Sequence, residues 1–255
     1  MEVVNLAAKN GVHVLCDKPI ATNLQDANKI IEVARKNNIK LMVPFNPRYQ
    51  LPVIKAKEMI DNKDIGELQY IYAVKYGKIP IIEGVDTSWF FDYGKAGAGG
   101  FGDIGIHAID ALRWLSGSEA KKVYANIGIN IHKIAVDDIG QVIIEFDNGV
   151  IACLSSGWAN PQGYPSWLDV KFEILGSKSA LTIEKPYHDF YIFDKEKTFI
   201  DYWYRRDIQY IVDEFINCIM ENREPAITGE DAKAALEIVL AAYESAKTGM
   251  VVKLR

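Results

Sequence analysis

The sequence predicts two kinds of sheet in one chain: α/β structure with a parallel sheet, followed by α+β structure with a large, mainly antiparallel sheet that helices cover on one face. Three observations predict it. Helix-like and strand-like segments alternate at the start of the chain, as in a parallel α/β sheet. Strand-like segments then dominate, and Asp147-Asn148-Gly149 between two apolar runs is a strong hairpin signal.

The first region reads as helix, strand, helix, strand, at residues 2–10, 12–16, 26–37 and 40–43. Gly11 follows the expected C-cap of the first helix, and Thr22 with Gln25 forms a capping-box arrangement ahead of the second. The first helix begins at Met1 without a capping residue and without a strand before it. We therefore expect that these residues form only the later part of a parallel sheet.

The second region begins after a boundary expected between Pro44 and Pro52. Its predicted strands lie at residues 68–77, 122–131, 138–147, 150–158, 170–175 and 179–184. Gly176-Ser177 is a second, weaker hairpin signal between the last two of them. Helices are predicted at 48–62, 103–115, 208–221 and 230–246, the last opened by Thr228 with Asp231 in its first turn.

Composition favours a small-molecule partner. The chain has 255 residues, 49% of them hydrophobic, and its net charge of −5 comes from 29 basic and 34 acidic residues that are well mixed. No basic surface suggests a nucleic-acid partner, and no apolar run suggests a membrane span. Three separated cysteines, at positions 16, 153 and 218, imply neither a disulfide framework nor a structural zinc site. With no signal peptide visible, we expect a cytoplasmic protein.

The stretch "GAGGFGDIGIH" matches G-x-G-x-x-G, the pattern of a dinucleotide-binding loop, at Gly97, Gly99 and Gly102. Such a loop must follow a strand and open a helix. The preceding "SWFFDYGKA" is aromatic and irregular, and Asp103 places a carboxylate where a pyrophosphate would lie. We interpret the match as a coincidence of spacing.

Asp103 and His107 are four residues apart, so they share one face of the predicted helix, and Asp110 continues that face. A carboxylate beside an imidazole suits a general acid/base. The structural alternative is that Asp103 complements the helix dipole, Asp110 pairs with Arg113, and His107 is a satisfied core residue. A metal site from these three residues is a weaker hypothesis, because no second histidine lies nearby, and we predict none.

Lys18, in "CDKPIA", directly follows a predicted strand. Ligands of parallel sheets bind beyond the carboxyl ends of the strands, so Lys18 is placed to face a crevice, with Pro19 fixing the backbone below it. The alternative is a surface lysine in a turn.

Together these motifs resemble the Gfo/Idh/MocA family of NAD(P)-dependent oxidoreductases. The matching segments are "GVHVLCDKPIA", "PFNPRY", "GGFGDIGIHAIDALRWLSG" and "EPAITGEDAKAALEIVLAAYESAKTG", with Asp17 in place of the usual Glu. The resemblance implies that residues 1–46 are the C-terminal remnant of a Rossmann-type dinucleotide-binding domain. Residues 47–255 would then form the substrate-binding and oligomerisation domain. Family members begin with a glycine-rich phosphate loop, for which we find no match, so we expect a truncated or short chain with impaired or lost activity.

The resemblance also implies hydride transfer between NAD or NADP and a hydroxyl-bearing carbon of a sugar, polyol or related substrate. His107 is expected to act as general acid/base, because an imidazole titrates near neutral pH and a lysine far above it. Asp103 would be its partner or bind substrate, and Lys18 would orient the hydroxyl and share its proton. Arg48 matches a substrate-contacting arginine of inositol dehydrogenases, whereas Lys18, Pro19 and Asn46 would line the cofactor side.

The resemblance further implies a homo-oligomer formed through the antiparallel sheet. Two alternatives stay open. One is a non-enzymatic assembly or sugar-binding module that has lost the cofactor. The other is a different reaction on the same cofactor, since similar proteins include a tetrapyrrole reductase and glycosidases that use NAD⁺ transiently. The loop around "SWFFDYGK" is expected to contact the substrate, whose identity no motif gives.

Overall fold

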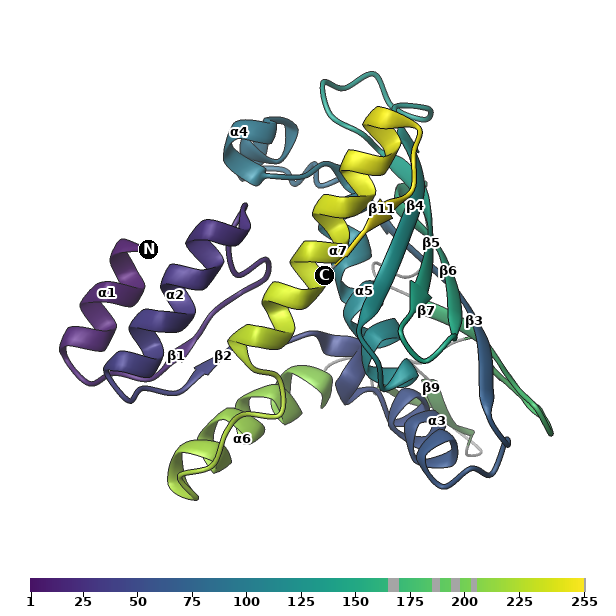
Figure 1. The fold of residues 1–255 in the computed structure, drawn as a ribbon, viewed down its shortest axis with the longest axis horizontal. Helices are drawn as coiled ribbons and strands as arrows, with labels where there is room; N and C mark the ends of the chain where they lie inside the picture. Colours follow the sequence, from purple (N-terminus) through teal and green to yellow (C-terminus); the bar gives the residue numbers. More distant parts are fainter. Residues whose placement is uncertain (165–169, 185–188, 194–197, 203–205, 255) are drawn as a thin grey trace.

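The computed structural model describes residues 1–164, 170–184, 189–193, 198–202 and 206–254. It contains a small parallel sheet and a large mixed sheet, with helices between them (Figure 1). This confirms the predicted fold class. Among the described residues, no helix is long and apolar enough to cross a membrane.

The small sheet pairs β1 (Val14–Leu15) with β2 (Leu41–Met42) in parallel, and α1 (Glu2–Lys9) and α2 (Leu24–Lys36) pack beside it. Gly11 follows the C-cap of α1 with φ of +66°, as predicted. The predicted cap of α2 is wrong. Asn23, not Thr22, is the N-cap, and its side chain accepts a hydrogen bond of 2.9 Å from the amide of Asp26. Because α2 begins at Leu24, Asn23 holds the N-cap position and reaches the amide of Asp26, three residues on, whereas a Thr22 cap would need the helix to begin one residue earlier.

The large sheet has the strand order β11-β4-β5-β6-β3-β7-β8, in which only β3 and β6 pair in parallel. Its strands are β3 (Leu68–Lys78), β4 (Ala120–Gly128), β5 (Ile139–Phe146), β6 (Ile151–Asn160), β7 (Val170–Gly176), β8 (Ala180–Ile183) and β11 (Val252–Lys253). Both predicted hairpins are confirmed. At the first, Gly149 takes φ of +86° and donates its N–H to the carbonyl of Phe146.

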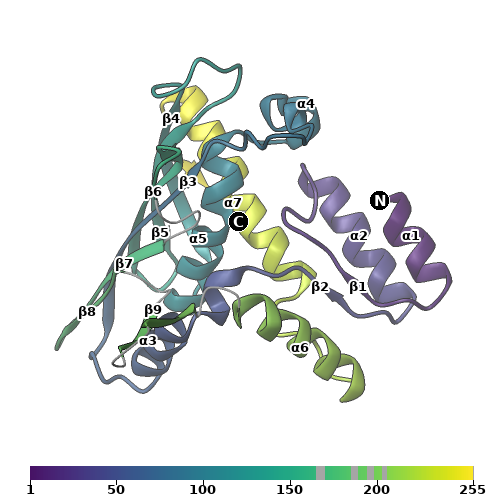
Figure 2. The same ribbon diagram turned by 180° about the vertical axis from the view of Figure 1, so that it is seen from behind.

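Helices cover the face of this sheet that points toward the small sheet, as Figures 1 and 2 show from opposite sides. They are α5 (Gly100–Ser116) and α7 (Gly229–Thr248), while α3 (Leu51–Asp61) and α6 (Arg206–Met220) lie near one end. Thr228 and Asp231 form the capping box predicted for α7. One hydrophobic cluster joins both sheets, with Leu41 of β2 and Ile144 of β5 among its members.

Several elements were not predicted. The short helices are η1 (Asn46–Tyr49), η2 (Ser88–Phe91) and α4 (Tyr93–Ala96), and β9 (Asp189–Phe193) pairs with β10 (Thr198–Tyr202) in a separate antiparallel hairpin. The helix predicted at 48–62 is in fact η1 followed by α3, separated at Gln50. Elements of two to five residues carry too few positions for a periodic pattern to be visible.

Candidate active site

Lys18 and Asp103 meet between the two sheets. Lys18 follows β1, and its Nζ donates to Oδ1 of Asp103 at 2.7 Å and to the main-chain carbonyl of Asp103 at 2.9 Å. Both side chains are mostly buried, with 16% and 19% of their surfaces exposed. The lysine at the end of β1 therefore lies against the first turn of α5, as part of a charge-assisted pair.

The other oxygen of this carboxylate is also bound. Oδ2 of Asp103 accepts a hydrogen bond of 2.9 Å from Nε1 of Trp158, a fully buried residue of β6. Asp103 does not hydrogen-bond to His107, the first of the two roles that the sequence suggested for it. The two residues share a helix face, but Lys18 and Trp158 bind the Asp103 carboxylate from outside the helix. Asp103 thus holds Lys18 in place.

His107 is a partly buried imidazole, and among the described residues no carboxylate hydrogen-bonds to its ring. Its Nδ1 is inaccessible to solvent and has no hydrogen-bond partner among the described residues. The ring of Phe45 packs edge-on against it, at 5.9 Å between ring centroids and 90° between planes. Burial, and then the positive charges of Lys18 and Lys75, lower the pKa of His107 well below its usual 6.5. The imidazole is therefore neutral at pH 7 and able to accept a proton.

A cavity of about 170 Å³ opens beside the Lys18–Asp103 pair. Its wall includes Pro19 and the aromatic rings of Trp89 and Phe90, which stack at 3.7 Å between centroids. Its lining therefore combines one ion pair with a flat apolar surface. His107 does not line this cavity, although its neighbour Ile106 does.

The glycines of "GAGGFGDIGIH" serve packing, and the interpretation of the motif as a coincidence is confirmed. No strand leads directly into α5, because η2 and α4 lie between it and β3. The amides of Gly99 and Gly102 donate to the hydroxyl of Tyr243 at 3.0 and 3.2 Å. The amide of Gly100 donates to the carbonyl of Asp137 at 2.7 Å, and that of Phe101 to its carboxylate at 2.8 Å. Protein groups thus take the amides that a phosphate would need.

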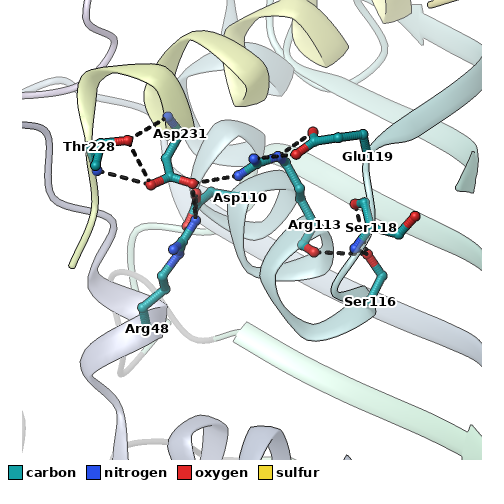
Figure 3. Close-up of polar contacts among 8 residues, drawn as sticks. All are labelled: Arg48, Asp110, Arg113, Ser116, Ser118, Glu119, Thr228 and Asp231. Atoms are coloured by element: carbon teal, nitrogen blue, oxygen red, sulfur yellow. Dashed lines mark hydrogen bonds and ion pairs between the residues drawn. The ribbon is translucent and has the colours of Figure 1, made fainter. Parts of the chain in front are cut away.

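Arg48 lies in a network of ion pairs that joins η1, α5 and α7 (Figure 3). Its guanidinium donates two hydrogen bonds to Asp110, of 2.7 and 2.5 Å, and lies 3.4 Å from Asp231. Arg113 pairs with Glu119 and with Asp231. The Asp110–Arg113 pair of the structural alternative is therefore not formed: from η1, Arg48 reaches the buried carboxylate, whereas Arg113 pairs with Glu119 and Asp231. The predicted contact of Arg48 with substrate stays a prediction.

The remaining predicted residues are near this region. Pro19 lines the cavity, and Asn46 donates from Nδ2 to Asp207 at 3.4 Å. Within the described ranges, no group of three or more His, Cys, Asp or Glu side chains is arranged to hold a metal ion.

Sequence reasoning missed Trp158, the partner of Asp103, and Lys75. Lys75 is fully buried in β3. It follows Ile71 and Ala73 on the inward side of that strand, so the alternation of the strand carried a signal for it. Trp158 had no local signal, because its partner lies on another element.

Family comparisons match both parts of the chain. A model described as "GFO/IDH/MocA C-terminal domain" matches residues 53–182, just over half of the chain. A second, "Oxidoreductase family, NAD-binding Rossmann fold", matches residues 1–45. The chain belongs to the Gfo/Idh/MocA family of oxidoreductases. NAD or NADP is thus the cofactor that membership in this family implies.

Similar Gfo/Idh/MocA proteins include dehydrogenases of inositols. The myo-inositol 2-dehydrogenase of Thermotoga maritima is 27% identical over 99% of this chain and 76% of its own length. The NAD⁺-dependent scyllo-inositol 2-dehydrogenase of Bacillus subtilis is 26% identical over 99% of this chain and 74% of its own. The solved structure of GenD2 from gentamicin A biosynthesis, in complex with NAD, has a TM-score of 0.83 at 22% identity and covers 100% of this chain and 75% of GenD2.

Proposed function

We propose that this protein transfers hydride between NAD(P) and a hydroxyl-bearing carbon of a sugar, polyol or related substrate. The observation that carries the proposal is the placement of a neutral His107 near the fixed Lys18–Asp103 pair, whose two residues line a cavity. The inositol dehydrogenases among the similar proteins support the substrate class.

The cavity fits the nicotinamide end of the cofactor. Trp89 and Phe90 offer a flat apolar wall, and Lys18 offers a donor beside it. The cofactor, when bound, supplies the carbon that accepts or donates hydride. We assign Pro19 and Asn46 to its nicotinamide side, residues 1–46 to the cofactor domain, and residues 47–255 to the substrate domain. The amides at the start of α5 do not fit its phosphates, since Asp137 and Tyr243 occupy them.

The protein residues move the proton. During oxidation, the substrate hydroxyl must lose its proton, and a neutral imidazole is the group able to take it at pH 7. Lys18 donates a hydrogen bond to the substrate oxygen, and Asp103 keeps its ammonium group in position. In the reverse direction, the same imidazole returns the proton.

The test combines binding with turnover. NADH fluorescence is titrated with the protein, and NAD⁺ reduction is followed with a panel of inositols and aldoses. We expect saturable but weak binding, because the phosphate groups find no glycine-rich loop among the described residues. We also expect His107→Gln to lower turnover by at least about 10²-fold, the usual share of a general acid/base. Absence of saturable binding would instead favour the assembly or sugar-binding module.

We further propose that the protein self-associates through the face of the large sheet that lies opposite α5 and α7. Tyr124 and Ile143 are cross-strand partners on this face, and both are more than 40% exposed, as are Ile151 and Leu175. Such a row of apolar side chains is typical of an interface. Sedimentation velocity is expected to show an oligomer that Ile143→Lys weakens, and a monomeric wild type at micromolar concentration would refute this proposal.

A further inference from the structure

Two contacts join η1 to α5 at matching spacing. Phe45, just before η1, packs against His107, and Arg48 binds Asp110. The Arg48–Asp110 pair lies three residues beyond the Phe45–His107 pair on both segments, which corresponds to about one helical turn. The segment 45–48 therefore lies along the face of α5 that carries His107.

The Arg48–Asp110 contact is the rigid one of the two. The guanidinium uses Nε and Nη2 on the two oxygens of one carboxylate, the bidentate geometry that fixes both distance and orientation. Asp110 is fully buried and the Arg48 side chain is 8% exposed. Arg48 also lies over the ring of Trp114 at 5.7 Å, and Asp231 connects it to the start of α7 (Figure 3).

For the His107 ring, by contrast, no polar group in the described ranges sets the orientation. Its Nδ1 is buried without a hydrogen bond in the described part of the chain. Catalytic imidazoles are usually held by a hydrogen bond from the second ring nitrogen. Here packing must do so, and Phe45, which is completely buried, is the aromatic side chain in contact with the ring.

We propose that Arg48 and Asp110 are positioning residues, which hold Phe45 against His107 and thereby fix the orientation of its imidazole for proton transfer. The proposal rests on the proposed function, because it assigns His107 the role of acid/base. It also gives Arg48 a task that needs no contact with substrate.

The charges that face His107 come from two other elements. Lys18 approaches from the end of β1 and Lys75 from β3. Arg48→Lys keeps the positive charge opposite Asp110, but it removes the planar guanidinium that binds both carboxylate oxygens. Any change at His107 in this variant therefore reports geometry rather than a lost charge.

The experiment is nuclear magnetic resonance of the full chain with ¹⁵N-labelled histidine. The chain has four histidines, and His107→Gln assigns the signals of His107. In the wild type we expect one tautomer that does not titrate near neutral pH. Arg48→Lys is expected to give exchanging tautomers and a titration midpoint shifted toward about 6.5, because water reaches the loosened ring. Phe45→Leu is a second variant with the same expectation.

Arg113→Lys is the matched control. It removes a similar bidentate pair, with Glu119, from the same network, but it does not touch η1. The wild-type His107 signals should persist in it. Unchanged signals in both Arg48→Lys and Phe45→Leu, or an equal change in Arg113→Lys, would overturn the proposal.

A separate outcome concerns the function alone. If His107→Gln keeps full turnover, the assignment of His107 as acid/base fails, while the spectra still decide whether Arg48 orients the ring. The two failures are thus distinguishable.

Discussion

Lys18 and Asp103 are 85 residues apart in sequence, yet one ammonium group binds both the carboxylate and the main-chain carbonyl of the same aspartate. Trp158 binds the remaining carboxylate oxygen. Both oxygens of the Asp103 carboxylate thus accept a hydrogen bond, one from Lys18 and the other from Trp158. The aspartate fixes the position of a lysine from the small sheet relative to the helix that carries His107.

This relationship predicts the effect of removing the lysine. Lys18→Met removes the donor that we propose for the substrate oxygen and leaves Asp103 without its cation. We expect kcat for oxidation of an active sugar or polyol to fall by at least about 10²-fold. Lys29→Met, which removes an exposed i,i+3 pair with Asp26, is the control and should stay near wild type. Equal rates for both variants would exclude Lys18 from the reaction.

The lowered pKa of His107 predicts a pH dependence of stability. Its pKa is lowered in the folded protein, whereas in the unfolded chain it is about 6.5. Below that value the unfolded chain binds a proton that the folded one does not. This contribution to stability is therefore complete above about pH 6.5 and is lost as the pH falls, with a slope of up to about 1.4 kcal/mol per pH unit.

Urea unfolding of the wild type and of His107→Gln between pH 7.5 and 5 measures this difference. The wild type should lose more stability than the variant over that interval. Parallel curves would show that His107 is not kept neutral by the fold.

The start of α5 predicts a contrast between two glycines. A Cβ on Gly100 would lie 2.8 Å from the main-chain carbonyl oxygen of Asp138 and 2.9 Å from the ring of Trp158, so backbone would have to move. At Gly105 the nearest atom is the side-chain Oγ of Ser156, at 3.3 Å. We expect Gly100→Ala to cost about 1–3 kcal/mol, and Gly105→Ala much less, since alanine favours the helix. Chemical denaturation of both variants measures their free energies of unfolding. Comparable losses of stability would contradict the packing role of Gly100.

Local patterns predicted most of the fold. The strands from β3 to β8 were found because alternation, β-branched residues and turn glycines are properties of neighbouring positions. The hairpin at Gly149 and the capping box of Thr228 and Asp231 were found for the same reason. The cap of α2 was missed by one residue, since two polar residues compete there and only backbone geometry selects Asn23.

The sequence predicted several residues of the site, but it did not predict which side chains bind one another. Sequence spacing placed Asp103, His107 and Asp110 on one helical face, which α5 confirms. It suggested Asp103 with His107 and Asp110 with Arg113 as partners, because residues four and three apart are the contacts that a helix offers. The actual partners, Lys18 and Trp158 for Asp103 and Arg48 for Asp110, come from other elements.

The sequence by itself therefore determined the order and type of the main elements, the helix that bears the motif, and the family. Only the tertiary structure decided which charges meet, that Asp137 and Tyr243 occupy the amides at the start of α5, and that Nδ1 of His107 is buried without a hydrogen-bond partner among the described residues. The physical reason is the distance along the sequence over which each effect acts. Periodicity and capping act over one or two turns of chain, whereas desolvation and ion pairing depend on what packing brings from far away in the sequence.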